Sequence, residues 1–244
     1  MSTLLAFDTS TERMSVALAA HGRVWAVDAP GGATASATLI PAILGLLAGA
    51  DVALRDLDAI GFGRGPGAFT GLRTACSVAQ GLALGAGKPV LPIDTLLTVA
   101  EDARAGADAI TLWVAMDARM NEIYAAEYRF GAGRWQVLQA PMLVSPEALN
   151  QRWDDAPPQC VAGNALAAFG AQLCAPGAVL LPDAWPHAAA LLPLAKAAWD
   201  AGAALDAALA LPLYLRDKVA LTSVERDAVR ALKLSATAKD GIAR

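Results

Sequence analysis

The chain has 244 residues, 56% of them hydrophobic and 17% charged, with a formal net charge of −4. This length supports a substantial core in one domain or two lobes. The slightly acidic balance excludes a chain-wide basic surface for nucleic acid, so we expect another subunit to supply most phosphate contacts if RNA is involved. The three cysteines lack CxxC spacing, which is typical of reduced cysteines, and we expect a cytoplasmic protein.

The N-terminal segment "MSTLLAFDTS" has no basic region and predicts a strand that ends at Asp8, rather than a signal peptide. The runs "SVALAA" and "RVWAV" follow with a turn at His21-Gly22, so residues 3–27 predict a three-strand meander. The uncharged stretch Gly31–Ala50 contains glycines and Pro41, and we expect a buried helix there rather than a membrane span.

Alternating helices and strands follow this meander. A strand is predicted for "AIGFG" and a helix for "TGLRTACSVAQGLALGAG", which Thr70 could cap. A strand at "KPVLPI" then leads to a helix that begins after Asp94.

The same pattern returns in the second half, where "ITLWVAMDA" ends in Asp117, 109 residues after Asp8. The runs "EIYAAEYRF" and "RWQVLQ" complete a second meander. Further helices are predicted after Ser145, at "NALAAFGAQL" and from Pro186, with strands at "QCVAG" and "AVLLP". We interpret the repeat as an internal duplication.

The duplication predicts an α/β fold with two lobes of the actin-like and Hsp70-like class, each built on a mixed sheet. The expected domains are residues 1–105, residues 106–221 and a polar C-terminal tail of residues 222–244. In that fold class an Asp at the end of the first strand of each lobe faces the cleft between the lobes, and Asp8 and Asp117 occupy those places.

Few residues indicate hydrolytic chemistry. The chain has only two histidines, and no HExxH, HxxxH or Cys/His cluster predicts a metal site. No GxSxG or SxxK motif predicts a serine nucleophile. An all-carboxylate Mg²⁺ site at Asp8 or Asp117 stays open at this point.

The expected phosphate cleft is degenerate. The turn after Asp8 lacks the glycine that kinases of this fold class usually have, although Thr9 and Ser10 could donate hydroxyl groups. The segment "CVAGNA" has one glycine, Gly163, where an adenosine-binding loop usually has two. We therefore expect weak nucleotide binding at most, and no efficient ATP hydrolysis.

The stretch "GPGAFTGLR" at residues 65–73 places three glycines just before a helix. Exposed N–H groups there could hold an anion, or the glycines could allow close packing. The small residues of the helix share one face, which suits a neighbouring helix in the same lobe or in another subunit.

Five segments together resemble the TsaB (YeaZ) family: "LLAFDTSTERMSVAL", "GPGAFTGLR", "MDARMNEIY", "VAGNA" and "LPLYLRDKVAL". They occur in order over residues 3 to 221. The resemblance implies a non-catalytic subunit for threonylcarbamoylation of adenosine 37 in tRNA. It implies pairing with the catalytic paralogue TsaD, recruitment of the ATPase TsaE, homodimerisation when alone, and only indirect contact with tRNA.

The resemblance also implies that first-lobe helices form the partner interface. The expected interface residues are Leu39, Ile43, Gly65, Gly67, Phe69, Thr70, Gly71, Arg73, Ala75, Val78, Ala79 and Leu82. The family more often has Ser where Ala68 stands and His-Ser-Glu at positions 35–37, where this chain has Ala-Ser-Ala. We expect no tightly bound cofactor, with weak ATP or ADP binding at a subunit interface, no metal and no membrane. The alternative functions are a glycoprotease-type peptidase and an ATP-dependent small-molecule kinase.

Overall fold

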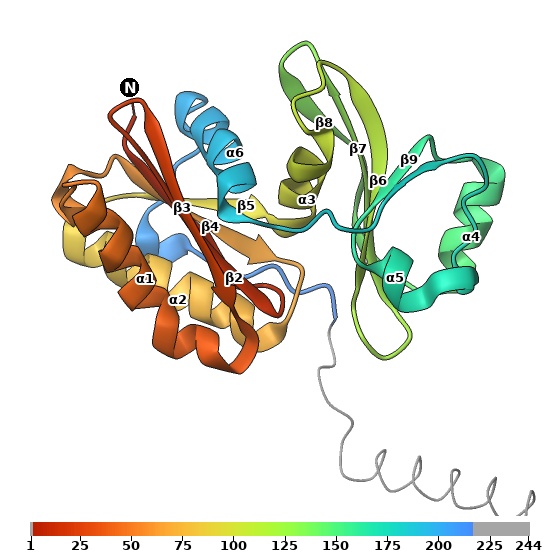
Figure 1. The fold of residues 1–244 in the computed structure, drawn as a ribbon, viewed down its shortest axis with the longest axis horizontal. Helices are drawn as coiled ribbons and strands as arrows, with labels where there is room; N and C mark the ends of the chain where they lie inside the picture. The colour runs from red at the N-terminus through yellow and green to blue at the C-terminus, as the bar shows by residue number, and fades with distance from the viewer. Residues whose placement is uncertain (1, 217–244) are drawn as a thin grey trace, which may run out of the picture.

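The computed structural model describes residues 2–216 and contains two five-stranded mixed sheets (Figure 1). The first sheet has the order β3-β2-β1-β4-β5 and the second β10-β9-β6-β7-β8. In each sheet three strands form an antiparallel meander and two more pair in parallel beside its first strand. This confirms the predicted duplication and the two-lobed actin-like fold, with residues 4–8 and 110–117 in separate sheets.

The first half forms the first sheet and three helices. Its strands are β1 (Leu4–Asp8), β2 (Arg13–Ala20), β3 (Arg23–Pro30), β4 (Ala59–Gly65) and β5 (Val90–Asp94). Its helices are α1 (Ala35–Gly49), α2 (Phe69–Ala86) and α3 (Thr95–Arg104), with short 3-10 turns η1 (Gly32–Thr34) and η2 (Leu54–Asp56). Figure 1 shows α1 and α2 side by side on one face of this sheet.

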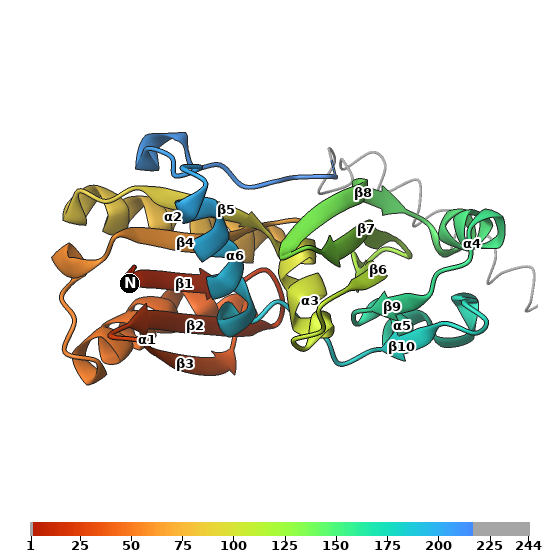
Figure 2. The ribbon, with the colours of Figure 1, turned by 90° about the horizontal axis from the view of Figure 1, so that it is seen from above.

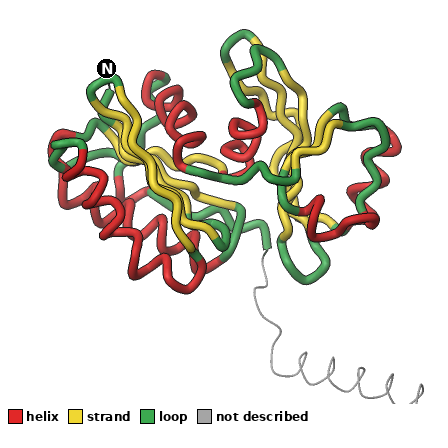
Figure 3. Tube along the Cα trace, viewed as in Figure 1, coloured by secondary structure: helices red, strands yellow, loops and turns green. Residues whose placement is uncertain are grey.

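The second half repeats the arrangement with shorter elements. Its strands are β6 (Ile110–Asp117), β7 (Ile123–Gly131), β8 (Arg134–Val144), β9 (Cys160–Ala162) and β10 (Val179–Leu181). Its helices are α4 (Pro146–Asp155), α5 (Ala165–Phe169) and α6 (Ala188–Asp200), with 3-10 turns η3 (Gly170–Gln172) and η4 (Ala207–Leu209). The coloured trace of Figure 3 shows how the strands of each half form a separate layer.

The last helix of each half packs against the sheet of the other half. Leu96, Val99 and Ala100 of α3 lie in the core of the second sheet. Leu191 and Ala195 of α6 lie in a core with β1 and β5 of the first sheet, and Figure 2 shows α6 across that sheet. The boundary predicted at residues 105 and 106 therefore separates the sheets but not the packing units, and α6 was wrongly assigned to the second lobe. The tail predicted at residues 222–244 lies outside the described residues.

Helix ends agree only in part with the predicted caps. Ser145 accepts a hydrogen bond from the Ala148 N–H, as expected for the cap of α4. Thr70 does not cap α2, because the helix begins one residue earlier and Ala68 is its N-cap. Asp94 occupies the N-cap of α3, but its carboxylate binds Arg64 instead of the helix N–H groups.

Candidate functional site: the interlobe residues and the α1–α2 surface

Asp8 is sealed inside the first lobe and does not face a cleft. Its side chain is only 1% exposed. The carboxylate accepts hydrogen bonds from the Ser10 N–H at 2.7 Å, the Ser10 hydroxyl at 2.5 Å and the Thr95 hydroxyl at 3.1 Å. Burial raises the pKa of Asp8 above its ordinary value, and these hydrogen bonds oppose the shift. A Cβ atom at Gly63 would lie 1.7 Å from the Asp8 Oδ2 atom, so the backbone of β4 closes over the group.

The segment after Asp8 is covered by the glycine-rich stretch. Thr9 and Ser10 are buried, and the Thr9 hydroxyl donates to the Gly71 carbonyl at 2.7 Å. A Cβ atom at Gly71 would lie 1.8 Å from the Thr9 carbonyl oxygen, and one at Gly67 would lie 2.6 Å from that of Ser10. The glycines allow two backbone segments to touch, so this stretch is a packing junction rather than an open anion site.

The corresponding turn of the second lobe is filled by an arginine. Arg119 donates its backbone N–H to the Asp117 carboxylate at 2.8 Å, and its guanidinium forms ion pairs with Asp117, at 3.2 Å, and with Glu12 of the other lobe. The Asn164 side chain accepts the Asp117 N–H at 2.9 Å. Gly163 has a φ of +114°, and a Cβ atom there would lie 2.4 Å from the Ala115 carbonyl oxygen.

These contacts do not fit a nucleotide between the lobes. Asp8, Thr9 and Ser10 are buried and hydrogen-bonded, so the predicted degenerate cleft does not exist at those three residues. Asp117 forms an ion pair with the guanidinium of Arg119. Within residues 2–216 no group of three or more His, Cys, Asp or Glu side chains has the arrangement of a metal site.

Half of the predicted interface residues are buried in their own lobe. This set consists of Leu39, Ile43, Gly65, Gly71, Ala75 and Ala79. The small face of α2 therefore packs against its own lobe, and the prediction that it contacts another subunit was wrong. The sequence could not separate the two cases because short side chains suit any close neighbour. Of the remaining residues, Thr70 and Arg73 are exposed, and Gly67, Phe69, Val78 and Leu82 are half-buried.

The opposite faces of α1 and α2 form an exposed apolar surface, which we call the α1–α2 surface. Ile40, Leu44 and Leu84 are 42%, 49% and 80% exposed. The window Gly32–Gly49 has a mean hydropathy of 1.6 and is long enough to span a membrane, but only 22% of it is buried. One such helix near the N-terminus is weak evidence for a span, because its residues Leu39, Ile43 and Leu47 pack on the sheet. The helix is half-buried rather than buried as predicted.

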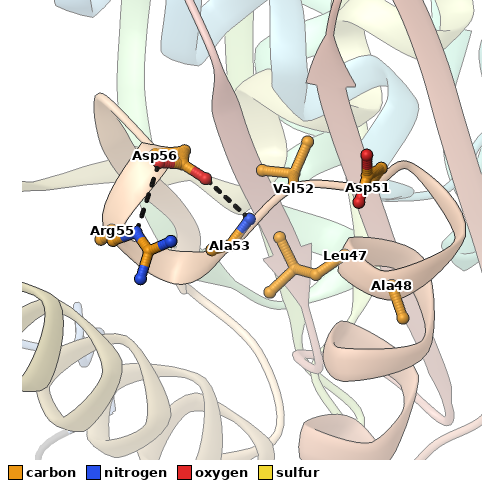
Figure 4. A pocket seen from close by; sticks show the side chains of 7 residues that line it. All are labelled: Leu47, Ala48, Asp51, Val52, Ala53, Arg55 and Asp56. Atoms are coloured by element: carbon orange, nitrogen blue, oxygen red, sulfur yellow. Dashed lines mark hydrogen bonds and ion pairs between the residues drawn. The ribbon is translucent and has the colours of Figure 1, made fainter.

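Two concavities lie where α1 and α2 end near η2. One has a volume of about 260 Å³ and is shown in Figure 4. Its lining consists of Leu47, Ala48, Asp51, Val52, Ala53, Arg55 and Asp56. There Asp56 accepts the Ala53 N–H at 3.0 Å and lies 3.8 Å from Arg55. The other, of about 450 Å³, is lined mostly by small and apolar residues. Its lining consists of Ala53, Leu54, Arg55, Gly81, Leu82, Gly85 and Ala86.

Comparison with known proteins places the chain among tRNA-modification proteins. The family model described as "TsaD: tRNA N6-adenosine threonylcarbamoyltransferase" matches residues 33–222. The tRNA threonylcarbamoyladenosine biosynthesis protein TsaB of Haemophilus influenzae is 36% identical over 89% of this chain and 94% of that protein. The Escherichia coli TsaB protein is 35% identical over 89% of this chain and 96% of its own length.

The chain belongs to the TsaB (YeaZ) family. A solved structure of YeaZ from Pseudomonas aeruginosa agrees, with 40% identity, a TM-score of 0.81, and coverage of 88% of this chain and all of that one. The resemblance found in the five sequence segments is thereby confirmed.

In this family member the last described residues form a strap across both lobes, which sequence reasoning missed. Leu205 pairs with Val90 at the edge of the first sheet, and the Leu213 N–H donates to the Arg64 carbonyl at 2.7 Å. Leu215 packs against the core of the second sheet, and Arg216 forms an ion pair with Glu122. Residues 211–216 of the strap are the first six positions of the family segment "LPLYLRDKVAL", and nothing in their sequence indicates these contacts.

Proposed function

We propose that this chain is a non-catalytic subunit required for making threonylcarbamoyladenosine at position 37 of tRNA. It acts by binding a TsaD-type catalytic paralogue through the α1–α2 surface. A TsaE-type ATPase joins the pair, tRNA is contacted only indirectly, and any ATP or ADP binds weakly at a subunit interface. The relatives named for threonylcarbamoyladenosine biosynthesis support the pathway. The exposed apolar helices support the mode of action.

Two glycines of α2, Gly81 and Gly85, support this interface, because nothing in the described chain lies close enough to require a glycine there. A Cβ atom at Gly81 or Gly85 meets nothing within 4 Å, whereas one at Gly71 in the same helix would strike the backbone. Glycine inside a helix costs about 1 kcal/mol relative to alanine. A partner helix that approaches α2 closely would account for this cost, since helix axes come near only where side chains are short.

The α1 helix repeats the feature. Gly45 and Gly49 lie at the same spacing of four residues, and a Cβ atom at either position also meets nothing within 4 Å. Together with the exposed Ile40 and Leu44, they leave an apolar helix with one unpartnered face. Association through such a face is driven by burial of apolar surface, at roughly 25 cal/mol per Å² before the costs of binding.

Neither alternative function gains support from the described residues. A kinase would need the side chains of Asp8, Thr9 and Ser10 to face a bound phosphate, but these residues are buried. A peptidase would need a cluster of metal-binding side chains or an activated nucleophile. The imidazole of His187 instead pairs with Asp102 at 2.8 Å, and no serine hydroxyl among residues 2–216 is hydrogen-bonded to it.

The test measures binding to the catalytic paralogue from the same organism. Gly81→Leu places a bulky side chain in the concavity lined by Leu54 and Gly85, and we expect the affinity to fall at least about tenfold. Ala197→Leu on the exposed face of α6 is the matched control, and its affinity should stay within a factor of two. Equal affinities for the two variants, both folded, would show that the α1–α2 surface is not the interface.

A further inference from the structure

The α1–α2 surface carries a single charge on its helices. Neither the 15 residues of α1 nor the 18 residues of α2 include an acidic or basic side chain other than Arg73. Arg73 is exposed, and within residues 2–216 no carboxylate forms an ion pair with it. An arginine that is covered by an apolar partner must find a compensating group, because a desolvated charge without one is costly.

Two aromatic side chains contact the Arg73 guanidinium and orient it. Its Cζ atom lies 3.7 Å from the centre of the Phe69 ring. Its Nε–H donates to the Tyr214 hydroxyl at 3.1 Å, and the Tyr214 ring lies 5.0 Å from that of Phe69. No hydrogen bond within residues 2–216 uses the terminal Nη1 and Nη2 groups. They therefore form a preorganised fork of the kind that binds a carboxylate through two parallel hydrogen bonds.

We propose that Arg73 binds a carboxylate that the catalytic paralogue contributes, as the one charged anchor that α1 and α2 supply to the interface. This inference rests on the proposed function, since it needs the α1–α2 surface to be the binding face. Arginine and tyrosine are the residues that most often dominate the binding energy of an interface, and Phe69 and Tyr214 remove much of the entropy cost of fixing the side chain. Tyr214 thus acts as a positioning residue for Arg73.

The chemistry favours a protein carboxylate over an RNA phosphate. Phosphate backbones are bound by several lysines and arginines spread along the contact, and the two helices offer only one. The large exposed side chains of these helices, Ile40, Leu44 and Leu84, are aliphatic and suit a protein surface.

The experiment compares Arg73→Glu, Arg73→Lys and Arg23→Glu by titration against the catalytic paralogue, with melting temperatures measured for each. Arg23 is the matched control because it is also exposed and also stacks on a ring, that of Trp25 on β3. We expect Arg73→Glu to weaken binding at least about 30-fold and Arg73→Lys about tenfold, because lysine keeps the charge but loses the fork. Arg23→Glu should stay within a factor of two.

Positioning by Tyr214 has its own readout. Tyr214→Phe keeps the ring on Phe69 and removes only the hydroxyl that holds the Arg73 Nε atom. We expect severalfold weaker binding at an unchanged melting temperature, and no further loss when the change is added to Arg73→Glu. Replacing the partner's interfacial carboxylate by lysine should restore binding of Arg73→Glu.

Three results would overturn the inference. If Gly81→Leu abolishes binding while folded Arg73→Glu binds like the unaltered chain, the interface stands but Arg73 is not its anchor. If neither change affects binding, the proposed function fails together with the inference. If Arg73→Glu weakens only self-association in sedimentation measurements, the carboxylate comes from a second copy of this chain.

Discussion

The contact between Gly71 and Thr9 gives a sharp prediction for stability. A Cβ atom at Gly71 would lie 1.8 Å from the Thr9 carbonyl oxygen and 2.9 Å from its carbon, and both are backbone atoms that do not rotate away. Gly71→Ala must therefore shift α2 away from the loop after β1. Overpacking of this kind costs roughly 1–3 kcal/mol. Because 1 kcal/mol shifts the melting temperature by about 2–4 °C at this chain length, we expect a decrease of about 2–12 °C.

The matched control lies in the same helix. The Cβ atom that Gly81→Ala adds meets nothing within 4 Å, and alanine is the best helix former. The free energy of unfolding of this variant should therefore increase by about 1 kcal/mol. Both variants are measured by thermal unfolding and by urea titration of the purified chain. If Gly71→Ala were as stable as the unaltered chain, the glycine-rich stretch would not be a packing junction, and its role as an anion site would have to be reconsidered.

Two further predictions concern buried and half-buried groups. Asp102 raises the pKa of His187 above 6.5, chiefly through its hydrogen bond to the ring. The pair's contribution to the free energy of unfolding is therefore fully present below pH 6.5 and is lost as the pH rises through the folded-state pKa. Unfolding measured from pH 5.5 to 9 should show this loss, and Asp102→Asn should remove it; an unchanged pH profile in that variant would contradict the assignment. Tyr128→Phe should raise stability by about 1 kcal/mol, because the buried hydroxyl has no hydrogen-bond partner among residues 2–216. A clear loss of stability would mean that the hydroxyl is satisfied in solution.

The fold could be predicted largely because the chain repeats its pattern. Asp8 and Asp117 end corresponding strands, and the alternation around them determined both meanders. The position of α6 could not be predicted in the same way. A helical pattern gives an apolar face, including Leu191 and Ala195, but does not say which of two sheets that face covers.

The candidate site was harder to predict because it depends on contacts between distant residues. The stripe of Gly71, Ala75 and Ala79 suits any close neighbour, and only the burial of these residues shows that the neighbour is their own sheet. Tyr214 reaches Arg73 across 141 positions in the sequence, so no local pattern connects them. Gly81 and Gly85 can be read from the sequence, but it does not show that they lie on an open surface. Their open surroundings appear only in the fold.

A reconstituted modification assay shows whether this chain is a non-catalytic subunit that acts through the α1–α2 surface. Threonylcarbamoyladenosine formation is measured with tRNA, the TsaD-type paralogue, the TsaE-type ATPase and this chain, either unaltered or with Gly81→Leu. We expect full activity with the unaltered chain and with Ala197→Leu, little activity with Gly81→Leu, and none when the chain is omitted or supplied alone. Formation of the modified nucleoside by this chain alone, or full activity with folded Gly81→Leu, would contradict a non-catalytic subunit that acts through the α1–α2 surface.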